Sequence, residues 1–181
     1  MTMPSRLRKF VLTTHIAASV GWIGAVVAYL VLVITAMGSQ DAQTLRAAWI
    51  AMDLIGWLAI VPLAIAALIT GVIMALGTKW GLFQHYWVLA SFALTLFATI
   101  VLLGHMQLVS EIASLAMAPD GPVAPELRTG LQEDLGHAGI GLLVLLVVHV
   151  LNVYKPRGLT PFGRRKQREQ RLTSPAYDTM A

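Results

Sequence analysis

The sequence predicts an all-α integral membrane protein, an up-down bundle of four transmembrane helices with N- and C-termini in the cytoplasm. Hydrophobic residues make up 57% of the 181 residues and charged residues only 12%, against roughly 25% charged in soluble domains. Four apolar segments are long enough to supply the ~20 residues that a helix needs to cross the hydrocarbon core. Lysine and arginine gather on one side of these segments, as expected for the cytoplasmic side.

The four predicted spans cover residues 10–37, 47–76, 86–109 and 135–154, within one membrane domain over residues 1–155. Each is expected to be a helix, because a long apolar run in lipid must satisfy its own backbone hydrogen bonds. The first run is about twice as long as the core of a signal peptide, so we expect it to be retained. Pro62 removes a backbone donor from the second span and predicts a kink there.

The distribution of charge predicts the orientation. If the N-terminus lies in the cytoplasm, Arg46 and Arg128 are the only basic residues on the outer side, and all other lysines and arginines are cytoplasmic. Such an excess of basic residues marks the cytoplasmic side of membrane proteins. The even number of spans agrees with this count, because it returns the C-terminus to the same side.

Two regions lie outside the predicted spans: a long connection before the fourth span and a basic C-terminal tail. Residues 110–134 form the longest connection, with a turn signal at 118–122 and a second half expected to be a short interfacial helix. Residues 156–181 are predicted to form a basic cytoplasmic tail, partly disordered, that contacts anionic lipid. Because the basic residues flank apolar segments and no nucleic-acid-binding motif accompanies them, no nucleic-acid partner is expected.

The absence of cysteine limits the chemistry. Disulfides, thiolate metal sites, iron–sulfur clusters and c-type haem attachment all require cysteine sulfur, so none of them is expected. The candidate functional groups are instead the polar residues inside the predicted spans, where polar side chains are costly and usually functional.

Four of the five histidines form two pairs at matching depths. His15 in the first span and His149 in the fourth lie at a similar distance from the cytoplasmic ends of their spans. His105 in the third span and His137 in the fourth lie near the outer surface. Two neutral imidazoles from different helices can hold a haem iron from opposite faces. The sequence therefore predicts one or two haem b groups, with these four histidines as iron ligands.

The two pairs cannot share one groove, because His137 and His149 are turned by about 120° from each other around a helix. Two haems would therefore lie on different sides of the fourth span. The alternative remains open that each histidine only forms hydrogen bonds between helices. The fifth histidine, His85, lies beside Tyr86 and Trp87 at the membrane edge and is predicted to be an interfacial residue.

Two further residues are candidates for the site. Trp22 shares one face of the first span with His15, and it is expected either to line a cofactor cleft or to pack in the bundle. Asp53 is the only acid well inside a span. It is expected either to balance Arg46 or Arg128, or to serve as a proton-relay or quinone-binding residue.

Copper is the alternative to haem at the outer face. Met106, Met117 and Glu111 are close to His105 in the sequence, and with His137 they offer the soft and imidazole ligands that copper accepts. Their spacing is not that of a compact metal motif, so the sequence leaves this alternative open.

Several segments resemble a known family: LTTHIAASVGWIGA, AMDLIGWLAIVPLA, WGLFQHYWVL, VLLGHMQ and VYKPRGLTPFG. Together they resemble the bacterial four-span membrane proteins classed as domain of unknown function 2269, over nearly all of residues 10–163. This resemblance implies the four-span fold and a place in the bacterial inner (cytoplasmic) membrane, without assigning an activity.

A more distant similarity is to the membrane protoporphyrinogen oxidase family, which has a histidine and a tryptophan placed as His15 and Trp22 are here. That resemblance implies haem b at His15. The same family needs a lysine at the position that Ser91 occupies, and this departure argues against its activity.

The sequence thus predicts a membrane-embedded b-type haem protein that transfers electrons between a quinol or other reductant and an acceptor. It leaves open whether this is an oxidoreductase in its own right. The alternatives are copper or other metal handling at the outer face, or a non-catalytic membrane subunit. Expected partners are the lipid bilayer, a quinone, and a second copy of the chain or a larger membrane complex.

Overall fold

The computed structural model describes residues 3–78, 81–118 and 125–172, and within these ranges it contains helices and no strand. This confirms the all-α prediction. The helices are α1 (Ser5–Gly38), α2 (Ala42–Ile55), the π-helical turn η1 (Gly56–Ile60), α3 (Val61–Gly77), α4 (Tyr86–Ala116), α5 (Glu126–Tyr154) and α6 (Pro161–Leu172).

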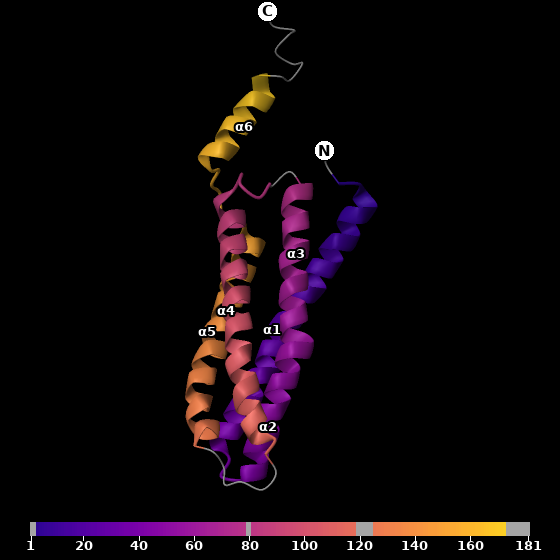
Figure 1. Cartoon of the computed structure of the whole chain (residues 1–181). Helices are drawn as coiled ribbons and strands as arrows, with labels where there is room; N and C mark the ends of the chain where they lie inside the picture. Colours follow the sequence, from indigo (N-terminus) through magenta and orange to yellow (C-terminus); the bar gives the residue numbers. More distant parts are fainter. Residues whose placement is uncertain (1–2, 79–80, 119–124, 173–181) are drawn as a thin grey trace, which may run out of the picture.

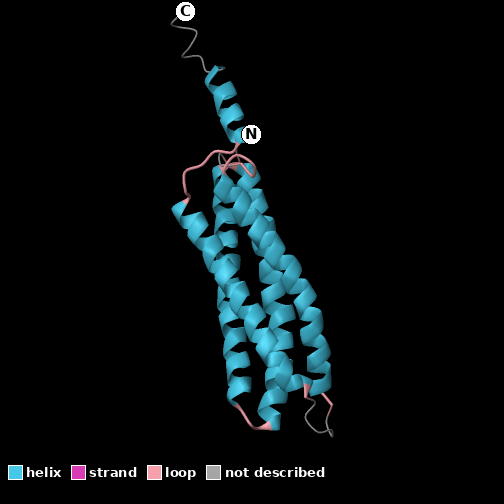
Figure 2. Ribbon diagram, turned by 90° about the vertical axis from the view of Figure 1, so that its left-hand side faces the viewer, coloured by secondary structure: helices cyan, strands magenta, loops and turns pink. Residues whose placement is uncertain are grey.

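Four helical segments are long and apolar enough to cross a membrane: Ser5–Gly38, Ala42–Gly77, Tyr86–Ala116 and Glu126–Tyr154. They confirm the four predicted spans. The bundle is up-down, with α1 packed against α2, α3 and α5, and with α4 packed against α2, α3 and α5. Figure 2 shows the long helices lying side by side.

The start of α1 and helix α6 lie at the same end of the bundle (Figure 1). We call this the terminal end, and we call the end with the α1–α2 and α4–α5 connections the loop end. The corresponding parts of the bundle are the terminal half and the loop half. That the terminal end faces the cytoplasm stays a prediction from the charges.

The second span is one continuous helical segment that passes through η1 immediately before Val61 and Pro62. A wide turn is a natural arrangement here, because proline cannot donate a hydrogen bond to the preceding turn. Gly56 opens this turn, and a Cβ at this position would overlap the sulfur of Met106 on α4. The glycine therefore lets α4 approach the second span closely.

The long helices extend beyond the predicted spans at the loop end. Helix α4 continues to Ala116 and α5 begins at Glu126, so most of the expected connection 110–134 is helical and its expected interfacial helix is the start of α5. The reason is packing: Leu127 is buried, and its carbonyl oxygen accepts a hydrogen bond of 2.8 Å from the Trp49 indole. The predicted turn at 118–122 falls mostly outside the described residues.

The basic tail contains helix α6, whose N-terminus is held against the loop before α4. The Thr160 hydroxyl accepts a hydrogen bond from the backbone N–H of Gly163, and the Thr160 N–H donates to the Gln84 carbonyl. A Cβ on Gly163 would overlap the Gln84 backbone, so only glycine fits this approach. Residues 173–181, the rest of the predicted tail, lie outside the described residues.

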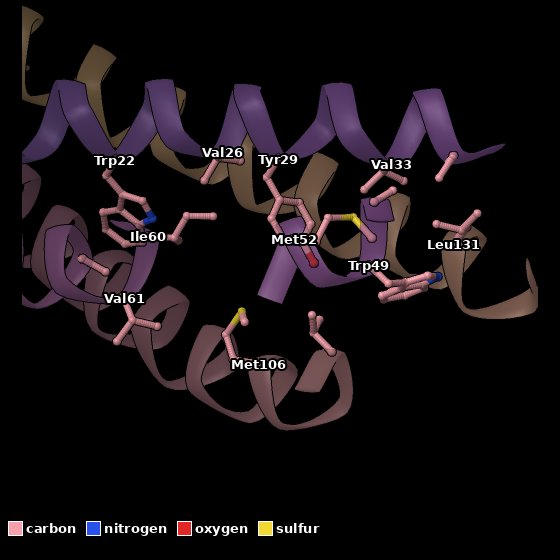
Figure 3. Packing of buried hydrophobic residues seen from close by; sticks show 14 of the residues in the cluster. Trp22, Val26, Tyr29, Val33, Trp49, Met52, Ile60, Val61, Met106 and Leu131 are labelled. Atoms are coloured by element: carbon pink, nitrogen blue, oxygen red, sulfur yellow. The ribbon is translucent and has the colours of Figure 1, made fainter. Parts of the chain in front are cut away.

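The main apolar core runs from the middle of the bundle to the loop end. On α1 it begins at Ala18, and its members on α4 are Met106, Val109 and Ala116. Figure 3 shows side chains from α1 and the second span meeting Met106 in this core. A second, smaller cluster of Ala75, Trp87 and Val88 lies at the terminal end. The layer between the two clusters carries the first group of candidate residues.

Candidate functional site

His15 projects from α1 onto α3. Its Nδ1 atom lies 3.1 Å from the carbonyl oxygen of Ala67 and 3.0 Å from the hydroxyl of Thr70. The carbonyl can only accept, and the Thr70 hydroxyl already donates to the Ala66 carbonyl at 2.6 Å. The hydrogen must therefore sit on Nδ1 of His15, which leaves a lone pair on Nε2 when the ring is neutral.

His149 on α5 adopts the same tautomer. Its Nδ1 atom donates to the carbonyl oxygen of Leu145, one turn back, at 3.0 Å, so its Nε2 also carries a lone pair. His15 and His149 lie on α1 and α5, which pack together. Among the described residues, neither Nε2 atom has a hydrogen-bond partner.

Gly71 on α3 lies directly against the His15 ring. A Cβ at this position would lie 3.2 Å from Cε1 of His15, closer than ordinary contact. On the α5 side, Asn152 lies one turn nearer the terminal end than Val148, donates to its carbonyl at 2.8 Å, and approaches the Ser91 hydroxyl of α4 at 3.3 Å. The terminal half thus holds a layer of polar side chains around the two histidines.

The loop half contains a different arrangement, centred on Asp134. This side chain is buried, with 1% of the residue exposed. Its Oδ1 atom accepts a hydrogen bond of 2.9 Å from the Tyr29 hydroxyl on α1 and contacts Nε2 of His105 on α4 at 2.6 Å. Figure 3 shows Tyr29 reaching from α1 into the core beside Met52.

His137 covers the outer side of His105. The two rings stack, with centroids 4.4 Å apart and an interplanar angle of 13°. His137 is exposed, and its Nδ1 donates to the Glu133 carbonyl at 3.0 Å. Stacked at this distance, the rings leave no space for a porphyrin between them. His105 and His137 as they lie here do not fit a shared haem.

The hydrogen bond of His105 also argues against a haem held by His105 and His137. The ring uses Nε2 toward the Asp134 carboxylate, so its other nitrogen, Nδ1, is the one left without a partner. Oδ2 of Asp134 is likewise buried without a hydrogen-bond partner. Two such atoms within one contact pair are unusual, because buried polar atoms are nearly always hydrogen-bonded.

Asp53 belongs to a second polar chain in the loop half. Its Oδ1 atom accepts a hydrogen bond of 2.6 Å from Ser110 on α4, which accepts one of 2.9 Å from the Trp57 indole. The hydrogen bonds of the two arginines expected to balance Asp53 go to backbone carbonyls. Arg46 donates to carbonyls at the end of α4, and Arg128 donates to carbonyls of the α1–α2 connection.

The residues proposed for copper do not converge. Met106 is buried in the core against Gly56, whereas Glu111 and Met117 are exposed. Over the described ranges, no three histidine, aspartate or glutamate side chains are grouped so as to hold a metal ion. Copper at this face therefore has no geometric support.

The two remaining candidates occupy ordinary positions. Trp22 is buried in the main core, next to Ile60 and Val61 in Figure 3, which fits the packing interpretation of this residue. His85 precedes the first turn of α4, with its ring 6.3 Å from that of Trp87. This place at the end of a span fits the interfacial interpretation.

Sequence reasoning missed Tyr29, Asp134 and Ser110 as members of the site. A signal was present for Tyr29, which lies in the middle of a predicted span whereas Tyr86 and Tyr154 lie at span ends. Asp134 lies just outside the predicted fourth span, in the predicted connection 110–134. Nothing in the sequence indicated its contact with His105.

Four spanning helices that enclose polar side chains define a multi-pass integral membrane protein. Residues 9–156 match the family described as predicted integral membrane protein DUF2269, and the chain belongs to this family. This confirms the resemblance seen in the sequence. Searches of the curated proteins and of the solved structures gave no match, so the likeness to protoporphyrinogen oxidase gains no support. The family description names no activity.

Proposed function

We propose that this chain is a membrane electron-transfer protein that holds one haem b in its terminal half, with His15 and His149 as the iron ligands. One observation carries the proposal: both rings donate Nδ1–H to a backbone carbonyl and keep the Nε2 lone pair free. Histidine ligands of metals almost always hold their second nitrogen in such a hydrogen bond, which fixes the ring orientation.

The surrounding packing supports the same assignment. On α1, Val11 is the only buried residue before Ala18 among those described, and on α5 no described residue after Val148 is buried. The terminal half therefore lacks the dense apolar filling of the loop half. A flat cofactor between α1 and α5 would contact side chains that the protein alone leaves exposed, and close van der Waals packing of this kind favours association within a membrane.

The chain's own residues would position the group. Gly71 leaves space for the His15 ring. The contacts of Nδ1 with the Ala67 carbonyl and the Thr70 hydroxyl fix the orientation of this ring. His149 is held only by its own helix, so its ring has more freedom to adjust. A bound haem b supplies a one-electron redox centre. A quinol or another reductant of the membrane is the electron donor in this proposal.

The absorption spectrum of the purified full-length protein tests the proposal, with haem supplied during expression and spectra taken before and after dithionite. We expect a Soret band and the sharp reduced bands of a six-coordinate haem b. His15→Ala and His149→Ala should each lose or strongly alter these bands, because one axial ligand is removed. His85→Ala, at the end of a span, is the control and should leave them unchanged.

Two outcomes contradict the proposal. One is a wild-type protein that is folded but shows no Soret band even with haem supplied. The other is a haem spectrum that survives both ligand substitutions unaltered. The first outcome would favour the alternative that the chain is a non-catalytic membrane subunit.

A further inference from the structure

We infer that one face of helix α6 is a docking site for an acidic helix of a partner protein in the aqueous phase at the terminal end. The face consists of Arg164, Gln167, Arg168 and Arg171, and we call it the arginine face. These four residues line an open hollow along the helix. Every residue of α6 after Gly163 is exposed. The inference does not depend on the haem, because α6 lies outside the four spans.

The spacing of the four residues places them on one side of the helix. Relative to Arg164, the others follow three, four and seven positions later, and such positions are neighbours on a helix surface. At 1.5 Å per residue, Arg164, Arg168 and Arg171 follow one another at intervals of about 6 and 4.5 Å. Carboxylates three and four residues apart on a second helix have the same intervals. Each guanidinium can therefore receive one carboxylate, a pairing that its planar fork of donors favours.

The charge of α6 is not balanced within the described part of the chain. The helix carries five basic residues and one acid, Glu169. Glu169 forms an ion pair of 3.1 Å with Arg165, which lies outside the arginine face. The guanidinium groups of Arg164, Arg168 and Arg171 have no partner among the residues that the structure describes. Their charge is therefore available to an anion from outside the chain.

The bundle holds α6 by its start and leaves the arginine face uncovered. The Thr160 N–H donates to the Gln84 carbonyl at 3.0 Å, and the Thr160 hydroxyl accepts a hydrogen bond of 3.0 Å from the Gly163 N–H. From this anchor α6 runs away from the spans (Figures 1 and 2). A helix of 12 residues is only marginally stable alone in water. The anchor therefore orders the helix in advance, which lowers the entropy cost of binding.

Anionic lipid, the contact that the sequence predicts for this tail, fits the arginine face less well. Exposed Tyr86 and Tyr154 lie at the span ends, where such residues mark the membrane–water interface. Because α6 runs away from this level, Arg168 and Arg171 lie about 10 and 15 Å from its start. Salt screens the charge of the lipid surface over about 8 Å. The helix also has no apolar side chain between Arg164 and Arg171 that could enter the bilayer.

Nucleic acid is the other polyanion that a basic helix could bind. The arginine face extends over only about 10 Å, and it contains no aromatic side chain on which a base could stack. A short row of guanidinium groups is better matched by a few carboxylates than by a continuous phosphate backbone. The geometry therefore favours an acidic protein helix.

Fluorescence anisotropy tests the inference, with full-length protein in nanodiscs of zwitterionic lipid and a labelled helical peptide as the probe. The peptide carries glutamates three and four residues apart along one face. We expect Arg168→Gln/Arg171→Gln to weaken binding by about tenfold, because two of three ion pairs are lost. The matched control, Arg165→Gln/Lys166→Gln, removes the same charge outside the face and should weaken binding by less than about threefold. All four side chains are exposed, so both variants should fold.

The same assay contains the results that would overturn the inference. They are a wild-type protein that does not bind the peptide, an equal loss of affinity in the two double variants, and tighter binding of a single-stranded RNA of equal charge. A dye on Leu172→Cys, the one cysteine of that variant, gives the lipid arm. We expect little collisional quenching by spin-labelled headgroups in nanodiscs with anionic lipid. Strong quenching would place α6 on the membrane and overturn the inference.

Discussion

The two halves of the bundle place their histidines in different surroundings. In the loop half, His105 faces a buried carboxylate and its partners are side chains within a dense apolar core. In the terminal half, His15 and His149 donate to backbone carbonyls in a layer with few buried residues. In the first arrangement, one ring nitrogen of the histidine is held by the carboxylate. The second fixes two rings and leaves one nitrogen of each free for a ligand.

An apolar layer separates the two groups. Trp22 and Val26 on α1 belong to the same apolar cluster as Ile60 and Val61 of the second span, and Figure 3 shows Val26 between Trp22 and the buried Tyr29 along α1. His15 and His149 therefore lie on one side of this layer and His105 and His137 on the other, while α4 carries the hydroxyls of Thr95 and Thr99 between Ser91 and His105. The two sites can thus be tested and altered separately.

The largest expected effect is the loss of Asp134. In Asp134→Ala, the Tyr29 hydroxyl and the His105 N–H lose their common acceptor in the core, and each unsatisfied buried donor costs about 1–3 kcal/mol. We expect the free energy of unfolding in mixed micelles to fall by about 2 kcal/mol or more. In apo protein, His149→Ala should cost about 1 kcal/mol or less, because no buried partner is left unsatisfied. Equal losses of unfolding free energy in Asp134→Ala and His149→Ala would contradict the proposed difference between the two halves.

A smaller effect is expected from adding one methyl group to each half. Gly56→Ala would overlap Met106 in the dense core, and such overpacking costs about 1–3 kcal/mol. Gly71→Ala would press on the His15 ring in the open layer, which can move aside, so we expect less than about 1 kcal/mol. Gly139, with no neighbour within 4 Å, is the control. A larger loss at Gly71 than at Gly56 would contradict the packing difference.

The smallest effect concerns the loop-end cap of α2. The Asp41 carboxylate accepts hydrogen bonds from the Thr44 hydroxyl at 2.7 Å and from its N–H at 2.8 Å. The hydroxyl bond first, and then the backbone bonds, lower the pKa of Asp41 below its ordinary value. Its contribution is therefore present above the unfolded pKa and lost as the pH falls through the folded one.

Hydrogen exchange in the first turn of α2 checks this cap. Exchange should accelerate, beyond the intrinsic pH dependence, as the pH falls below about 4. Asp41→Asn can still cap the helix but does not titrate, so its protection should stay nearly constant. A variant with the same acid response as wild type would show that another group is responsible.

Hydropathy and charge were sufficient for the four spans, because long apolar runs in lipid leave the backbone no alternative to helix. They failed at the ends of α4 and α5. By composition, a polar residue such as Asp134 is predicted to lie in a loop. It is nevertheless buried, because its carboxylate forms hydrogen bonds with His105 and Tyr29. Local composition cannot reveal partners that are far away in the sequence.

Depth along the spans correctly placed His105 beside His137, but it could not supply the stacking of their rings or the tautomers. Those depend on side-chain rotation and on which carbonyl or carboxylate lies within reach. Helix α6 was missed for a related reason. Its charge resembles that of a disordered tail, whereas its start is held by Thr160 and by the close approach of Gly163 to Gln84.

The central claim is that the terminal half, and not the loop half, binds the cofactor. His149 and His137 provide the most direct comparison, because both lie on α5 and both donate Nδ1 to the carbonyl four residues earlier. Reduced-minus-oxidised spectra of His149→Ala and His137→Ala should be compared at equal protein concentration with haem supplied. The account predicts that the six-coordinate haem bands disappear in His149→Ala and persist in His137→Ala. Loss of the bands in His137→Ala with retention in His149→Ala would contradict it.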